Sequence, residues 1–165
     1  MTAAEGQDET ALGALQGLGL MGDPRGVSAL LDALHNRNRQ VVEVANGALH
    51  ILTGHGEEMD VPGSRSRWQL WWEQNEHRFT PGLRYRDGEL LGPHGFLERM
   101  DAFDPWTRRT AYDELVISSG CQLPFDSDGP WRVQRAHLRA WRRWVMTEGR
   151  DLTPGHWFLD GQKIG

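Results

Sequence analysis

Three tryptophans on one side of a short helix constrain this chain more than any other feature. Trp68, Trp71 and Trp72 lie within residues 45–79 and, with Asn75, are spaced i, i+3, i+4 and i+7. That spacing places all four side chains on one helical face. Because tryptophan carries a large apolar surface, the pattern predicts a broad contact between stacked helices. The alternative is an aromatic groove that receives a partner, and the helical spacing favours the core.

The same succession recurs in outline in the second half of the chain. The earlier helix ends at Thr53-Gly54, before the loop that leads to the three tryptophans. Residues 114–120 likewise end in Ser-Ser-Gly and lead to a helix that carries Trp141 and Trp144.

Amphipathic patterns predict further helices in the first half. Leucines and alanines from residue 9 indicate a helix that closes at residues 22–24, where the sequence Gly-Asp-Pro marks a stop followed by a new start. Apolar residues at 27, 30, 31 and 34 indicate a second helix, and those from Val41 to Leu52 a third.

The first and third of these helices repeat each other at an offset of 34 residues. The matching residues are Ala11, Gly13, Ala14, Leu15 and Leu18 against Ala45, Gly47, Ala48, Leu49 and Leu52. Repeated helix–turn–helix units of this period are typical of α-solenoids. We expect the small residues to let neighbouring helices approach closely. We expect one buried seam made of Leu15, Leu30, Leu34, Leu49 and Leu52.

At this point the residues resemble a known family. Residues 14–34, which include the turn Gly-Asp-Pro-Arg, resemble a HEAT repeat of the short bacterial type. Residues 48–75 resemble the closing segment of bacterial HEAT-repeat proteins. Residues 82–144 are similar to the C-terminal region of HEAT-repeat proteins found near bacterial type VI secretion clusters. The residues that carry the likeness of this C-terminal region are Arg109, Ala111, Glu114, Leu115, Pro124, Phe125, Trp131, Gln134, Trp141 and Trp144.

The resemblance implies an all-α fold of HEAT-like antiparallel helical repeats, an α-solenoid with a short insert. It implies HEAT-like repeats with a Trp-rich closing helix over residues 9–79 and a helical C-terminal region over 80–165 that packs on them. It also implies a non-enzymatic scaffold or adaptor for protein–protein interaction, accessory to a bacterial secretion or effector system. Two alternatives stay open: a HEAT-like nucleic-acid-binding protein or DNA-glycosylase-like enzyme, and a HEAT protein of the bilin-lyase type.

The insert falls near residues 80–92, where the helical period breaks. Leu83 and Tyr85 precede the dipeptide Asp87-Gly88, which favours the tight turn of a β-hairpin. A bare linker is the alternative.

Bulk composition disfavours several classes of protein. The net charge is −5, whereas domains that bind a nucleic-acid backbone usually carry a basic excess. The single cysteine, Cys121, excludes an internal disulfide. No apolar stretch approaches the length of a membrane span, so we expect a soluble cytoplasmic protein.

The candidate partner-binding surface is a row of arginines. Residues 130–150 hold six arginines and one acidic residue, and Arg132, Arg135, Arg139 and Arg142 are spaced 3, 4 and 3 on one helix. The row lies beside an expected apolar seam of Trp131, Leu138, Trp141 and Val145. Three interpretations stay open: charge pairing with the acidic residues 101–128, binding of an acidic protein, and binding of a nucleic acid.

Two tryptophans outside long apolar stripes complete the candidate surface. Trp106 and Trp157 are expected to be exposed and to contribute to partner binding. We expect no catalytic residues, cofactor or metal site. His50, His55, Glu57, Glu58 and Asp60 crowd one loop, but their spacing matches no common metal motif.

Overall fold

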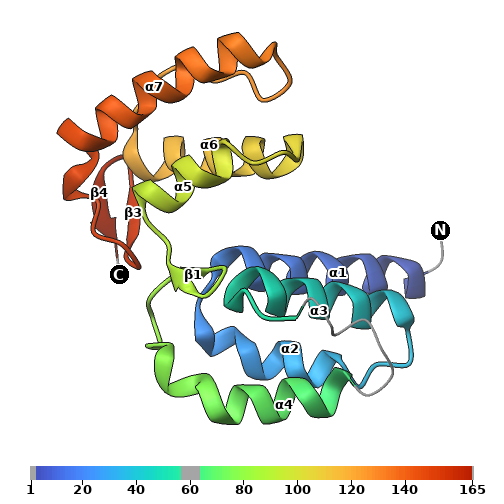
Figure 1. Cartoon of the computed structure of the whole chain (residues 1–165). Coiled ribbons are helices and arrows are strands. Elements are labelled where there is room, and N and C mark those ends of the chain that lie inside the picture. The colour runs from blue at the N-terminus through green and yellow to red at the C-terminus, as the bar shows by residue number, and fades with distance from the viewer. Residues whose placement is uncertain (1–2, 57–63, 165) are drawn as a thin grey trace. The chain divides into compact units, whose positions relative to one another are not determined.

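The computed structural model describes residues 3–56 and 64–164, and most of them are helical (Figure 1). The chain forms two compact units, Met1–Leu90 and Leu91–Gly165. The division lies later than the boundary expected at residue 80. The intervening hairpin packs on the first unit, where the N–H of Tyr85 donates to the carbonyl of Gly22 at 2.8 Å.

Four α-helices build the described part of the first unit. They are α1 (Ala3–Met21), α2 (Val27–Ala33), α3 (Arg39–Thr53) and α4 (Ser64–Asn75). α1 and α2 run in opposite directions, and α3 returns beside α1 in the same direction as α1 (Figure 1). α4 runs in the same direction as α3 and not against it, so the expected antiparallel pairing does not extend to α3 and α4.

α1 and α3 approach closely at Ala48, one of the small residues of the repeat. A Cβ atom on Gly19 would lie 2.7 Å from the Cα of Ala48, so only glycine fits there. Gly13 and Gly47, another matching pair of small residues, face open space and allow no such contact. The two helices therefore cross near the C-terminal end of α1.

The predicted leucine seam is largely confirmed. Leu30, Leu34, Leu49 and Leu52 are buried in one cluster, and Leu15 is partly buried against it. Trp68 is buried in the same cluster, whereas Trp71 and Trp72 are only partly buried. The tryptophan face is thus a core element at Trp68 and a border of the core at the other two.

The predicted hairpin is confirmed. β1 (Tyr85–Arg86) pairs antiparallel with β2 (Glu89–Leu90). Between them Asp87 and Gly88 have φ angles of 53° and 82°, the two positive values that a type I′ turn requires.

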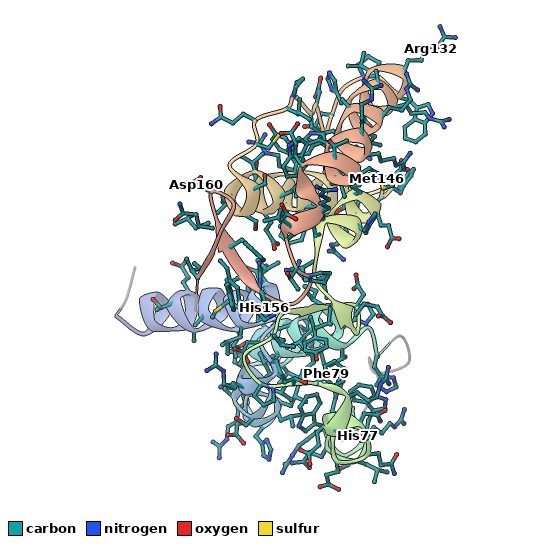
Figure 2. The ribbon with its side chains drawn as sticks, turned by 90° about the vertical axis from the view of Figure 1, so that its left-hand side faces the viewer. His77, Phe79, Arg132, Met146, His156 and Asp160 are labelled. Carbon is teal, nitrogen blue, oxygen red and sulfur yellow. The ribbon has the colours of Figure 1, made fainter. Side chains whose placement is uncertain are left out.

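The described part of the second unit has three α-helices and a second hairpin. Its helices are α5 (Pro93–Met100), α6 (Pro105–Ser119) and α7 (Trp131–Thr147). The hairpin joins β3 (Trp157–Leu159) to β4 (Gln162–Ile164), with Asp160 at its tip (Figure 2). Asp160 and Gly161 again have positive φ angles, 48° and 77°.

The long helices α3 and α6 correspond to each other. Both contain 15 residues, and both end at a glycine in the left-handed conformation, Gly54 and Gly120. In both helices the last residue carries a hydroxyl, on Thr53 and Ser119, that donates to the carbonyl four residues earlier, at 2.7 and 2.6 Å. The two helices are therefore stopped by the same device.

Each hairpin turn caps the end of its long helix in the same way. In the first unit the N–H groups of Asp87 and Gly88 donate to the carbonyls of Ile51 and Leu52, at 2.8 and 3.1 Å. The corresponding bonds in the second unit run from Asp160 to Ile117 at 3.0 Å and from Gly161 to Ser118 at 2.8 Å. These bonds satisfy carbonyl groups that a helix end leaves without partners.

The Trp-bearing helices α4 and α7 also correspond. Trp68 and Trp71 meet edge to face with ring centroids 5.9 Å apart, and Trp141 and Trp144, 73 positions later, do so at 5.6 Å. The sequence Thr-Pro-Gly precedes each Asp-Gly turn at the same spacing. Both units therefore share one plan: a short helix, a long helix, a Trp-bearing helix and a capping hairpin.

Candidate functional site

The candidate surface is one face of α7. An adjacent face, about 100° round the helix, is anchored in the core by Gln134, Leu138, Trp141 and Val145, which are all buried. The four predicted arginines, which we call the arginine stripe, are all exposed. Arg132 projects away from the ribbon at the start of the helix (Figure 2). The helix therefore holds the stripe on a rigid support.

Trp131 does not belong to the buried seam, contrary to prediction. Its side chain is 54% exposed. The buried seam starts about one turn later, at Gln134. The side-chain amide of Gln134 donates to the carbonyls of Ser127 and Gly129 at 3.1 and 2.8 Å, and these bonds fix the loop before α7 over this end of the core. Trp131 precedes Gln134 and lies outside the seam. The guanidinium of Arg135 lies 5.5 Å from the ring centroid of Trp131, which is a cation–π contact.

Charge pairing engages only one end of the stripe. Arg142 donates to Asp101 at 2.8 Å, and both side chains are partly exposed to solvent. The guanidinium groups of Arg132, Arg139 and the neighbouring Arg143 form no hydrogen bond or ion pair with any residue that the structure describes. The interpretation of the stripe as an internal charge seam therefore fails along most of its length.

Three other acidic residues before α7 are engaged elsewhere. Asp113 pairs with Arg109 on α6 at 2.9 Å. Asp104 accepts the N–H of Thr107 at 2.7 Å as the N-terminal cap of α6, and this bond lowers the pKa of the Asp104 carboxyl. Asp126 accepts the N–H of Asp128 at 3.1 Å within its own loop. These local bonds explain why the acidic segment leaves the arginines to solvent.

The stripe continues into a hollow between α5 and α7. Met146 follows Arg142 by one turn, extends the 3, 4, 3 spacing by another 4, and is 70% exposed. It borders a cavity of about 400 Å³ whose walls are His94, Leu97, Glu98, Arg142 and Met146, which we call the α5–α7 hollow. Sequence reasoning missed Met146, although the unbroken spacing of the stripe was the signal for it.

The two other predicted tryptophans do not join the stripe. Trp106 is 52% exposed, as expected, but it lies at the start of α6. Nearby, Phe103 is 99% exposed, an apolar side chain that the sequence analysis did not single out. Trp157 lies in β3 opposite Ile164 and is only half-buried, so its expected exposure is partial.

The first unit has a cleft of about 620 Å³ between α2 and α4. Its walls include Arg25, Trp72, His77 and Phe79, the last two labelled in Figure 2. Arg25, the arginine in the wall of this cleft, already has a partner, because it donates to the carboxylate of Asp23 at 2.8 Å. Burial raises the pKa of Asp23, but the hydrogen bonds from Arg25 and from the backbone of Gly82 outweigh it and hold that pKa below its ordinary value. The cleft thus has no unpaired arginine comparable with the stripe.

His55, in the loop after α3, packs on the tryptophan face. His55 stacks on Trp71 with ring centroids 4.4 Å apart and meets Trp68 edge to face. Burial lowers the pKa of His55, and the nearby His50 lowers it further. Within residues 3–56 and 64–164 no three acidic, histidine or cysteine side chains are grouped to hold a metal ion. Glu57, Glu58 and Asp60 lie outside the described residues.

Comparisons of this chain with protein-family models, with curated proteins and with solved structures found no match. In the part of the chain that the structure describes, no helix combines the length and apolar character needed to cross a bilayer. The candidate site therefore rests on the geometry of α7 and of the α5–α7 hollow.

Proposed function

We propose that this protein is a non-enzymatic helical scaffold that binds an acidic segment of a partner protein through the arginine stripe of α7. The observation that carries the proposal is the row of exposed arginines on a helix whose adjacent face anchors it in the core, with the side chains of Arg132 and Arg139 unpaired among the described residues. Guanidinium groups bind carboxylates through paired, planar hydrogen bonds, so such a row suits carboxylate-bearing side chains.

An acidic protein fits better than a nucleic acid. The net charge of −5 repels an extended phosphate backbone at distances beyond the stripe itself. Glu98 and Asp101 border the far end of the stripe and would meet the phosphates directly. A protein segment with a few carboxylates opposes only the arginines, because it need not continue across these acids.

A HEAT-like solenoid is the architecture that we propose for this scaffold. The antiparallel pair α1–α2 and the parallel stacking of α1 on α3 support it. The shared direction of α3 and α4 departs from the simple pattern. The role as an accessory of a bacterial secretion or effector system rests on the sequence resemblance.

The test is capture of partners from the native host by the purified protein, followed by mass spectrometry and by binding to the purified candidate. Charge reversal at Arg135 and Arg139, both to Glu, should abolish binding and leave the melting temperature nearly unchanged. The matched control is the same reversal at the exposed Arg65 and Arg67 of α4, which should retain binding.

Binding by the wild type should weaken as salt rises, because exposed charges are screened. A clear drop in the melting temperature of the Arg135/Arg139 variant, or equal losses in both variants, would contradict the proposal. A gel-shift assay with duplex DNA at physiological salt should show no complex.

A further inference from the structure

The stripe and the α5–α7 hollow form one continuous surface. Arg132, Arg135, Arg139, Arg142 and Met146 follow each other at intervals of 3, 4, 3 and 4 along α7. They therefore share one face over a rise of roughly 21 Å, at 1.5 Å per residue. Four positions present a cation, and the fifth presents an exposed thioether at the edge of a cavity.

We propose that the bound segment is an acidic helix of the partner protein, with an apolar side chain one turn beyond its carboxylates that enters the α5–α7 hollow. This proposal rests on the proposed function and adds the form of the partner and the anchor that sets its register. The charge of the stripe selects the acids, and the hollow selects the apolar residue.

The spacing favours a helix over an extended strand. Successive arginines of the stripe are about 5.4 Å apart along α7, the rise of one helical turn. A partner helix lying along α7 repeats its own side chains at the same interval and stays in register over all five positions. Side chains on one face of a strand repeat at about 6.7 Å, so a strand drifts by roughly one position over the same length.

The hollow suits one apolar side chain. Leu97 is buried at its base, and Met146, flexible and 70% exposed, can close over an inserted group. Its volume of about 400 Å³ is near the lower end of the roughly 300–1,000 Å³ of small-molecule pockets. His94, Glu98 and Arg142 form a polar border, so an apolar group gains contact only at the centre.

The described part of the first unit offers no second copy of this surface. The positions of α4 that correspond to Arg139, Arg142 and Met146 are occupied by Ser66, Gln69 and Glu73. The inferred docking site is therefore specific to the second unit.

Synthetic peptides test the inference by fluorescence anisotropy. The probe is a labelled alanine-based helix with glutamates at i, i+3, i+7 and i+10 and a leucine at i+14. A second peptide reverses this order, and matched versions carry serine in place of leucine. One of the two leucine peptides should bind about tenfold more tightly than its serine version, the gain expected from burying a leucine in part.

Substitutions separate the anchor from the charges. Met146→Ser should weaken the leucine peptide about tenfold and leave the serine peptide unchanged. Leu70→Ser on α4, where the side chain is 56% exposed, is the matched control and should change neither. Arg139→Gln should weaken both peptides. Thermal melting checks that each variant is folded.

Each outcome decides a different point. Equal binding of leucine and serine peptides, with no effect of Met146→Ser, would overturn the anchor and leave the proposed function standing. Equal binding of a proline-containing peptide that cannot form a helix would overturn the helical form. No binding of any acidic peptide, or binding unaffected by Arg139→Gln, would overturn both this inference and the proposed function.

Discussion

The two units agree in their interiors and differ on their surfaces. Trp68 and Trp141 occupy corresponding places and are 1% and 0% exposed, and each meets a second tryptophan edge to face. In the long helices, buried Ala45 and Leu49 correspond to buried Ala111 and Leu115. On the solvent side of the Trp-bearing helices, however, the arginines of α7 have no counterpart on α4.

This difference shows which positions the fold constrains, the buried ones, and which it leaves free to vary, the exposed ones. A buried position must fill a fixed volume, so the same kind of residue suits it in both units. An exposed position carries no such constraint and can take any charge at little cost in stability. A row of four arginines in one unit only is therefore the feature that the shared plan does not explain. We accordingly infer a function at that surface.

The largest expected effects concern the paired tryptophans. Trp68→Ala and Trp141→Ala should each lower the free energy of unfolding by about 3–5 kcal/mol, because a large buried ring leaves a cavity. Urea denaturation monitored by circular dichroism measures the loss. A loss below about 1 kcal/mol at either site would show that the two units do not share a core of this kind.

Replacement of the same two tryptophans by phenylalanine tests whether their indole N–H groups contribute differently to stability. The Nε1–H of Trp68 donates to Asn46 at 2.8 Å, whereas that of Trp141 has no hydrogen-bond partner among the described residues. Trp68→Phe should therefore cost more than Trp141→Phe, by about 0.5–1.5 kcal/mol for the lost bond. Equal losses would contradict this assignment of the bond.

The next largest effect concerns the glycines that end the long helices. Alanine at Gly54 or Gly120 must adopt a left-handed conformation, which costs roughly 1–2 kcal/mol. A Cβ at Gly54 would also lie 2.5 Å from the carbonyl oxygen of Asp87, while one at Gly120 would lie 3.2 Å from the nearest atom. Gly54→Ala should thus destabilise more than Gly120→Ala in thermal melts. The reverse order would show that the two hairpins cap their helices differently.

The smallest effect is a pH dependence confined to the first unit. His55 packs on the tryptophan face there, and Cys121 occupies the corresponding position in the second unit. Burial lowers the pKa of His55, so its contribution to stability is full above the ordinary pKa of about 6.5 and is lost as pH falls through the lower folded value.

Melting temperatures of the wild type should therefore fall slightly on acidification below about pH 6.5. His55→Gln should remove that part of the dependence, and the control His77→Gln at an exposed site should keep it. An unchanged pH profile in His55→Gln would contradict the account.

Local signals predicted much of the fold. The dipeptide Asp87-Gly88 predicted its hairpin. The same dipeptide at Asp160 and Gly161 also forms a hairpin turn, but the residues around it lack the strand-like alternation that predicts strands. The helical spacing at Trp68 predicted a core contact. The direction of α4 relative to α3 carries no local signal, because it depends on packing between helices distant in sequence.

The sequence predicted some features of the candidate site and not others. The spacing of Arg132, Arg135, Arg139 and Arg142 placed them on one face, but only packing shows that this face is exposed. Trp131 fits the period of the buried seam and yet lies outside it, since the seam is closed by Gln134 and its bonds to the preceding loop. Periodicity indicates which residues share a face and not how far along the helix the core extends.

The most direct test of the comparison uses the eight tryptophans as probes of both units. Their indole N–H signals are recorded by NMR while the labelled helical acidic peptide is added, and single Trp→Phe variants assign them. The account predicts that the Trp131 signal shifts, because its ring lies against Arg135 in the stripe, while the Trp68, Trp71 and Trp72 signals stay in place. Charge reversal at Arg135 and Arg139 should abolish the shift. Binding that moves the signals of the first unit and leaves that of Trp131 unchanged would contradict the assignment of the partner site to the second unit.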